Sequence, residues 1–265
     1  MIPFRDNIPS RTAPVLTGLL IAANLIVFLR ETTLSEIDRE GFLYRYGVVP
    51  YSFAIIGEGP KTIERPAERR VQSGRYVEVQ RVIIQFNLEG TARAAILPLF
   101  SSMFLHGSWM HLIGNMWFLW LFGDNVEDRL GRVRYLLLYV LSGLAAGVTQ
   151  VYVDWGAQVP IIGASGAVAG VLGAYMVTYP YARVLAWVPF FYFFWPVVEL
   201  PAVVFLGIWF LMQFFQGAAA IAGPHSGGVA WWAHVGGFVA GIVLMWLLAP
   251  QLPGRRGPKW GEVVG

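Results

Sequence analysis

Two residues that can act together as nucleophile and base, Ser165 and His234, each lie in a run of small residues inside an apolar stretch of the chain. Hydrocarbon does not solvate polar side chains, so a histidine within a membrane segment is expected to face a polar partner. A serine hydroxyl is a poor nucleophile at neutral pH and needs a base to remove its proton. Histidine can take that proton and return it to a leaving amine. The two runs therefore point to acyl transfer by a serine–histidine pair.

The small residues around the serine and the histidine indicate how two helices could bring them together. Glycines remove bulk from one side of the serine run, and two of them have the G-x-x-x-G spacing of closely packed membrane helices. In the histidine run, glycines follow the histidine at i+3 and i+7, on its own helical face. The alternative for the serine alone is a hydrogen bond to the carbonyl of the preceding turn. The helix-packing glycines that we predict are Gly163, Gly166, Gly170, Gly237 and Gly241.

A second polar pair could supply donors to the oxyanion that forms during acyl transfer. His111 and Asn115 are four residues apart and share a helical face, and the backbone N–H of Ser165 would be a third donor. The alternative is that the pair joins helices by hydrogen bonds. No acidic residue lies within the serine or histidine run, so we expect a dyad rather than a triad. His106 and His111 are five apart and lack acidic or thiol partners, so no metal is predicted.

The composition is that of a membrane protein. Of 265 residues, 56% are hydrophobic and only 13% are charged, whereas soluble domains carry about a quarter charged residues. The absence of cysteine excludes disulfides, thiolate chemistry and cysteine-ligated metals. The net charge is +3 and no basic run resembles a nucleic-acid footprint. We therefore predict no cofactor and no nucleic-acid partner.

The hydropathy pattern predicts an all-α membrane fold with six spans. Arginines gather in the N-terminal tail, in a loop at 124–134 and in the C-terminal tail, whereas the loops at 154–160 and 217–230 have neither Lys nor Arg. By the positive-inside rule, both termini are cytoplasmic. His111, Ser165 and His234 would then share one depth near the outer leaflet. The predicted spans are 13–29, 108–123, 134–153, 161–178, 198–216 and 231–249.

The long connection at 30–107 is expected to lie outside the cell. Its apolar part, 41–56, is rich in aromatic residues and could rest in the membrane interface. Within 57–93, Val77, Val79 and the run 82–86 look strand-like after the turn signal Ser73-Gly74, which predicts a small β-hairpin. A proline-rich segment at 179–201 is expected to be an interfacial cytoplasmic loop, because frequent prolines break helices.

At these residues the chain resembles the rhomboid intramembrane serine proteases. The G-A-S-G at 163–166 resembles the nucleophile motif of that family, and 106–115 resembles its H-x-x-x-N pattern. The G-x-x-x-E-x-x-x-G at 123–131 resembles the turn that follows, and 233–237 resembles the histidine helix. The four motifs occur in the family's order over roughly 100–245, whereas 57–93 has no counterpart.

The resemblance implies a role for each motif residue. Ser165 would be the nucleophile, His234 the general base, and the oxyanion donors would be those named above. Phe205 and Trp209 would form a gate between substrate and active site, the alternative being bulk that faces lipid, and the loop 217–230 would be a flexible cap. Some relatives carry an aromatic ring, stacked on the histidine, at the position of Ala169, so another group must position this imidazole.

The sequence thus favours a serine endopeptidase that cleaves transmembrane segments of membrane proteins near the outer leaflet, with lipid and membrane-protein substrates as its partners. The alternatives are a rhomboid-like protein that binds membrane helices without cutting them, and a transporter, which is disfavoured because no inverted repeat is visible. The expected location is a bacterial inner membrane. We expect a cytoplasmic tail at 1–12, a membrane domain at 13–250 that includes the 30–107 loop, and a second tail at 251–265.

Overall fold

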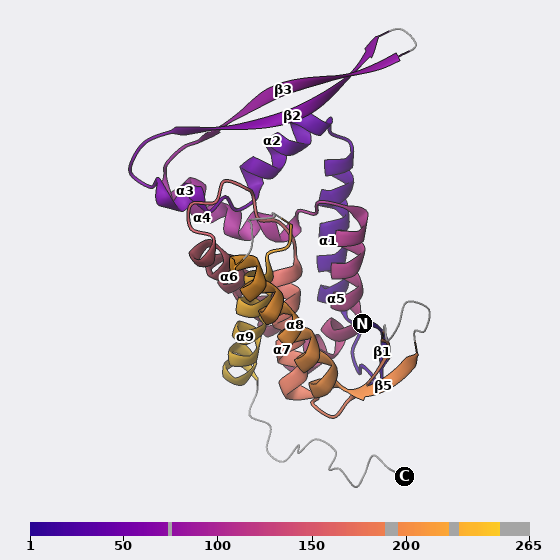
Figure 1. The fold of residues 1–265 in the computed structure, drawn as a ribbon. Helices are drawn as coiled ribbons and strands as arrows, with labels where there is room; N and C mark the ends of the chain where they lie inside the picture. The colour runs from indigo at the N-terminus through magenta and orange to yellow at the C-terminus, as the bar shows by residue number, and fades with distance from the viewer. Residues whose placement is uncertain (74–75, 189–195, 223–227, 250–265) are drawn as a thin grey trace, which may run out of the picture.

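The computed structural model describes residues 1–73, 76–188, 196–222 and 228–249, and most of them are helical (Figure 1). The predicted C-terminal tail at 251–265 lies outside the described residues. The helices are α1 (Val15–Thr32), α2 (Glu36–Tyr46), α3 (Tyr51–Ala54), α4 (Ala92–Ser101), α5 (Trp109–Leu130), α6 (Arg132–Val153), α7 (Ser165–Thr178), α8 (Ala202–Ala222) and α9 (Trp231–Leu248), with a 3-10 turn η1 (Ser102–Phe104). The strands are β1 (Ile2–Asp6), β2 (Lys61–Ser73), β3 (Tyr76–Leu88), β4 (Arg183–Trp187) and β5 (Val197–Pro201).

Within the described residues, 4 helices (α1, α6, α8 and α9) are long and apolar enough to cross a membrane. A fifth span arises if the segment Ala92–Phe104 and α5, which meet at a bend of 78°, count as one. The helix α7 has 14 residues, fewer than the roughly 20 that a full crossing needs. The chain is therefore a mostly helical protein with several candidate spans, one of which is broken and one short.

Several of the predicted boundaries are wrong, including those of the fifth span, since β5 occupies 197–201 and α8 then continues to Ala222. Instead of a loop at 124–134, α5 continues to Leu130 and α6 begins at Arg132. The only residue between them is Gly131, whose φ of +76° makes the sharp turn. The fourth helix begins at Ser165 rather than at 161, because the chain before it is not helical and Ile161 pairs with Val48.

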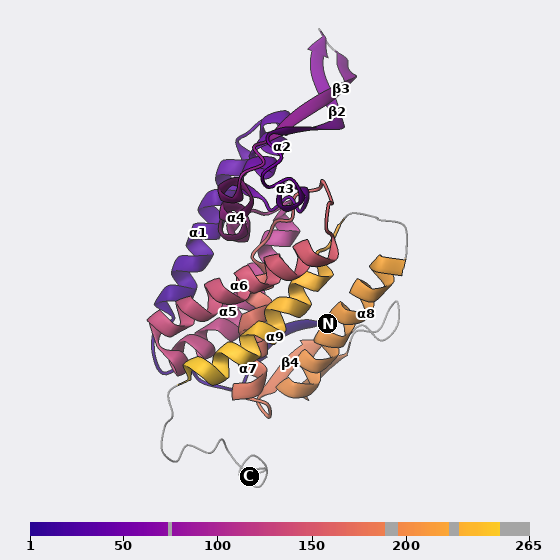
Figure 2. The same ribbon diagram turned by 90° about the vertical axis from the view of Figure 1, so that its left-hand side faces the viewer.

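The short helix α7 lies at the centre of the bundle, between α5, α6, α8 and α9 (Figures 1 and 2). Every residue from Gly166 to Tyr175 is buried. A helix that is apolar on all sides is stable only where neighbours cover it fully. The larger exposed hydrophobic side chains belong instead to the outer helices, for example Ile26 on α1 and Trp246 on α9.

Two glycine pairs let α7 and α9 touch backbone to backbone. A Cβ placed on Gly237 would collide with the carbonyl oxygen of Gly166. One placed on Gly241 would collide with the carbonyl oxygen of Gly170. Residues 166 and 170 thus face 237 and 241 in the same order, so the two helices run parallel. The predicted close-packing faces do meet.

The predicted hairpin in the loop after α1 is present, and it is longer than expected. Strands β2 and β3 pair antiparallel over 13 residues each, with Ser73 opposite Tyr76. The hairpin extends away from the helices at one end of the molecule (Figure 1). Its base packs on α2 and α3 through a small apolar cluster in which the Tyr44 and Phe86 rings stack, with centroids 3.8 Å apart.

At the opposite end of the bundle, β1, β4 and β5 form a sheet in the order β1-β4-β5. The prediction of a loop throughout 179–201 is therefore wrong for β4 and β5, which pair antiparallel. The predicted tail at 1–12 contains a strand that pairs with β4. Asp6, at the end of β1, accepts hydrogen bonds from the Tyr175 hydroxyl and from Asn125 Nδ2, so the N-terminal segment is tied to α5 and α7.

The carboxylate of Glu127 joins the beginning of α1 to the end of α5. It accepts hydrogen bonds from the backbone N–H groups of Leu16 and Thr17, at 2.9 and 2.8 Å, and from the Thr17 hydroxyl at 2.9 Å. The first N–H groups of a helix have no partner within it, and this carboxylate supplies one. The glutamate of the G-x-x-x-E-x-x-x-G motif is thus a helix cap between two elements.

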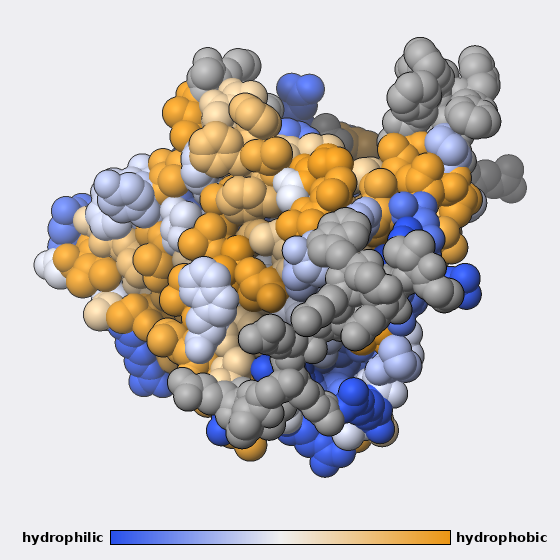
Figure 3. Space-filling view, turned by 90° about the horizontal axis from the view of Figure 1, so that it is seen from below, coloured by the Kyte–Doolittle hydropathy of each residue, from blue (hydrophilic) through white to orange (hydrophobic). Residues whose placement is uncertain are grey.

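The outer surface is largely apolar. Seen from the end that carries the β1-β4-β5 sheet, hydrophobic side chains cover much of the visible face and hydrophilic ones gather toward its margins (Figure 3). Exposed apolar area of this extent indicates a lipid-facing surface. Together with the candidate spans, it defines a multi-pass membrane protein.

Candidate active site

The beginnings of α5, α7 and α9 lie at the same end of the bundle. The α5 and α7 pair runs parallel, because His111 lies beside Gly163 and, further along, the Phe122 ring meets that of Tyr175 with centroids 4.9 Å apart. The α7 and α9 pair is parallel as described above. Since His111 and Ser165 are the third and first residues of their helices, and His234 is the fourth of α9, all three side chains occupy first turns at one level.

Ser165 is the first residue of α7. This position bears on the alternative that its hydroxyl only hydrogen-bonds within its own helix. No helical turn precedes it, so the predicted alternative of a hydrogen bond to a preceding-turn carbonyl does not apply. The first intrahelical bond runs from Val168 N to the carbonyl of Ala164. Among the residues that the structure describes, the backbone N–H of Ser165 has no hydrogen-bond partner. It lies at the positive end of a helix, where negative charge is stabilised.

Gly163 brings the histidine of α5 beside the serine. Its φ of +125° is a conformation that side-chain-bearing residues rarely adopt. A Cβ there would lie 2.7 Å from His111 Nε2 and 3.5 Å from Ser165 Oγ. The Gly163 N–H donates to the Ser102 carbonyl at 2.9 Å, which fixes the turn. Only glycine lets the imidazole and the hydroxyl border the same space.

The His234 ring contacts Gln213 of α8, which sequence reasoning did not identify, and it also lies beside two tryptophan rings. Its Nδ1 lies 2.8 Å from Oε1 of Gln213. The Trp209 ring lies beside it with centroids 6.0 Å apart, and the Trp231 ring stands at 90° to it at 6.1 Å. A polar residue in the apolar α8 was the available signal, because such residues need a partner.

The Asn115 side chain contacts a second histidine of the same segment, His106. Its Nδ2 lies 3.0 Å from Nε2 of His106, and both side chains are buried. Two hydrogen bonds fix the backbone of His106. Arg39 donates to the His106 carbonyl at 2.9 Å, and the His106 N–H donates to the Glu31 carboxylate at 3.2 Å. The His106 ring also lies beside the His111 ring, with centroids 5.0 Å apart, so Asn115, His106 and His111 form one polar cluster.

The two predicted gate residues have different surroundings. The Phe205 ring is fully buried against Phe122 of α5, with centroids 6.4 Å apart, so the alternative that it faces lipid is wrong. Trp209 is half-buried and borders His234. The predicted cap loop at 217–230 begins later than expected, because α8 continues to Ala222. Its part at 223–227 lies outside the described residues.

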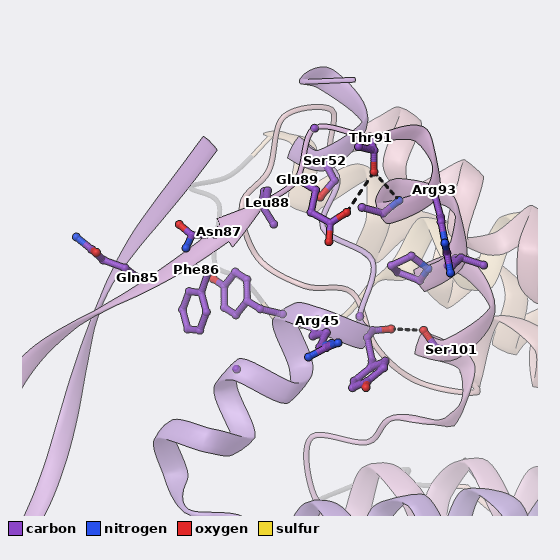
Figure 4. A pocket seen from close by; sticks show the side chains of 18 residues that line it. Arg45, Ser52, Gln85, Phe86, Asn87, Leu88, Glu89, Thr91, Arg93 and Ser101 are labelled. Atoms are coloured by element: carbon purple, nitrogen blue, oxygen red, sulfur yellow. Dashed lines mark hydrogen bonds between the residues drawn. The ribbon is translucent and has the colours of Figure 1, made fainter. Parts of the chain in front are cut away.

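A large cavity lies elsewhere, beneath the base of the hairpin. This half-open hollow of about 780 Å³ lies between α2, β3 and α4, with Arg45, Phe86 and Arg93 in its lining (Figure 4). Hydrogen bonds from Thr91 to Glu89, and from Ser101 to the Tyr46 carbonyl, tie its walls together. None of its lining residues belongs to α7 or α9, so this cavity is separate from the Ser165 site.

In the described part of the chain, no hydrogen bond joins Ser165 Oγ to His234. Catalytic hydrogen bonds are often loose in unliganded structures and tighten when substrate binds. What the site provides is a hydroxyl at a helix N-terminus, a backbone donor, and an imidazole on a helix in backbone contact with the first. Fold and site together define a helical membrane protein with polar, chemically competent groups clustered at one end of its bundle.

The comparisons with known proteins give the family. The family model of the Rhomboid domain matches residues 93–251, and the chain belongs to the rhomboid family. It is 30% identical over 166 residues to "Rhomboid protein 1, mitochondrial" of Saccharomyces cerevisiae, which covers 60% of this chain and 44% of that protein. It is also 30% identical over 203 residues to "Presenilin-associated rhomboid-like protein A, mitochondrial" of Danio rerio, covering 71% and 51%.

A plant relative extends the comparison. The chain is 29% identical over 157 residues to "Rhomboid-like protein 11, chloroplastic" of Arabidopsis thaliana, covering 56% of this chain and 51% of that protein. The chain thus spans about half the length of the curated relatives it matches. Their names place these relatives in mitochondria and chloroplasts, which gives no support to the predicted bacterial membrane.

Proposed function

We propose that the protein is an intramembrane serine endopeptidase that hydrolyses peptide bonds in or near transmembrane segments of other membrane proteins. The observation that carries the proposal is the glycine-mediated contact of α7 and α9, with Ser165 and His234 both in first turns at the same end. Family membership supports it. We further propose six spans, with α7 as the short fourth one and the termini cytoplasmic.

In the proposed reaction, His234 Nε2 removes the proton of Ser165 Oγ as the oxygen attacks a substrate carbonyl. The Ser165 N–H, the His111 Nε2–H and the Asn115 amide donate to the resulting oxyanion. The Asn115 amide has two hydrogens, so it can also keep its contact with His106. The imidazolium then gives its proton to the leaving amine, and an acyl-enzyme remains on Ser165. A water molecule, deprotonated by His234, hydrolyses the ester and restores the serine.

The shortness of α7 supports cleavage below the membrane surface. At 1.5 Å per residue, its 14 residues cover about 21 Å, less than the roughly 30 Å hydrocarbon thickness. Ser165 would then lie below the outer boundary, at the bottom of the 154–164 connection. A substrate helix must unwind to present an extended strand there, so helix-weak segments with small residues should be preferred. We propose that Trp209, with Phe205 as its buried anchor, gates their approach along α8.

The test uses the full chain in proteoliposomes with a transmembrane reporter substrate. Ser165→Ala and His234→Ala should each abolish cleavage, whereas Ser10→Ala, at an exposed position, should leave it intact. A fluorophosphonate probe should label the wild type and not Ser165→Ala. Undiminished cleavage by either dyad variant would refute the mechanism. Capture of the reporter without cleavage or labelling by the wild type would instead indicate a rhomboid-like binder of membrane helices.

A further inference from the structure

Gln213 is a buried polar residue in the apolar helix α8, with 6% of its surface exposed. Its Oε1 lies 2.8 Å from Nδ1 of His234, and its Nε2 donates to the Trp209 carbonyl at 3.3 Å. Both ends of the amide are therefore engaged, one with the proposed base and one with its own helix. Buried polar groups in hydrocarbon are costly unless they are satisfied in this way.

The second contact fixes the orientation of the amide. A backbone carbonyl can only accept a hydrogen bond, so the nitrogen of the amide must face Trp209 and the oxygen must face His234. An oxygen likewise can only accept, so Nδ1 of the imidazole must carry the proton. Nε2 is then left with its lone pair, which is the tautomer that a base acting on a serine hydroxyl requires.

The same contact suits the charge that develops during catalysis. When His234 takes a proton it becomes an imidazolium, and its hydrogen bond to the amide oxygen becomes charge-assisted and stronger. A carboxylate would do this too, but at the cost of a buried charge within the lipid. In some relatives an aromatic ring at the position of residue 169 stacks on the histidine, whereas this chain has a small, buried alanine there. The neutral amide of Gln213 takes the place of that ring as the group that positions the imidazole.

We propose that Gln213 is the positioning residue of His234, which holds the imidazole in its Nδ1–H tautomer and completes a Ser165–His234–Gln213 array. This rests on the proposed function, because positioning matters to the reaction only if His234 is the base. Gln213 acts through His234 and not on the substrate. Its loss should therefore lower kcat and leave KM nearly unchanged.

The kinetic test compares three variants in proteoliposomes. Gln213→Leu removes the acceptor and should lower kcat about 10- to 100-fold. Gln213→Glu keeps an oxygen at the same place and should restore most of the rate, with the acidic limb of the pH–rate profile displaced. Gln216→Leu makes the same change at an exposed position one turn further along α8 and should match the wild type. Wild-type kcat in Gln213→Leu, alongside Ser165-dependent cleavage, would overturn the positioning role and leave the protease intact.

A second measurement does not depend on activity. In ¹⁵N-histidine-labelled protein, the His234 signals, assigned by their loss in His234→Ala, should show a protonated Nδ1 and an unprotonated Nε2. Gln213→Leu should convert them to a mixture of tautomers, whereas Gln216→Leu should not. An Nε2-protonated ring in the wild type would refute the inference even if proteolysis is established. The expected tautomer in a protein that does not cleave would refute the proposed function alone.

Discussion

The contact between α7 and α9 can be tested by adding a single methyl group at Gly241. A Cβ at this position would lie 2.5 Å from the carbonyl carbon and 2.6 Å from Cα of Gly170, whereas ordinary contact begins at 3.4 Å. Backbone atoms cannot rotate away as a side chain can, so the helices must part by roughly 1 Å. Forced enlargement of a close-packed interior costs about 1–3 kcal/mol. We expect Gly241→Ala to lower the free energy of unfolding by about 3 kcal/mol, at the upper end of this range, because several backbone atoms collide at once.

The same displacement reaches the site, since Gly241 lies two turns along α9 from His234. A misplacement of about 1 Å can lower an enzyme's rate about 100-fold. The assay measures both the free energy of unfolding in detergent and the cleavage of a transmembrane reporter. Gly207→Ala on α8 is the control, because a Cβ there meets nothing within 4 Å. It should change stability by less than about 1 kcal/mol, in the stabilising direction. Equal stability and activity of the two variants would refute the reasoning.

Two further predictions concern the anchors of the N-terminal segment. The Glu127 carboxylate accepts three hydrogen bonds from Leu16 and Thr17, and the amide of Glu127→Gln cannot accept them all. Denaturation should show that this variant loses about 2–3 kcal/mol in the free energy of unfolding. Unchanged stability would contradict the capping role. Burial raises the pKa of Asp6 above its ordinary value of 3.8, so its contribution to stability is fully present below pH 3.8 and is lost as the pH rises through the raised pKa. Asp6→Asn should therefore gain stability relative to the wild type as the pH rises above about 4, and a difference that does not vary with pH would exclude this linkage.

Much of the protein followed from local sequence patterns. Hydropathy predicted each helix of the bundle, because a segment in hydrocarbon must satisfy its backbone bonds internally. Strand-like residues after a turn signal predicted the β2-β3 hairpin. The glycine spacings predicted that Gly166 and Gly170 would face the histidine helix. Such faces can be read from one segment at a time, since i, i+3, i+4 and i+7 positions lie together on any helix.

The tertiary structure decided what depends on partners distant in the sequence. In the β1-β4-β5 sheet, β1 pairs with a strand about 180 residues further along the chain. Neither β1 nor β4 therefore showed a recognisable strand-pairing pattern in its own segment. Gln213 meets His234 only because α8 and α9 pack with one particular rotation, which hydropathy does not fix in an apolar helix. The contact of Asn115 with His106 likewise depends on the bend before α5, which brings the two residues together. The sequence by itself determined which segments are helical and which of their faces carry small or polar residues. The partners of those residues followed from how the helices are rotated and shifted against one another.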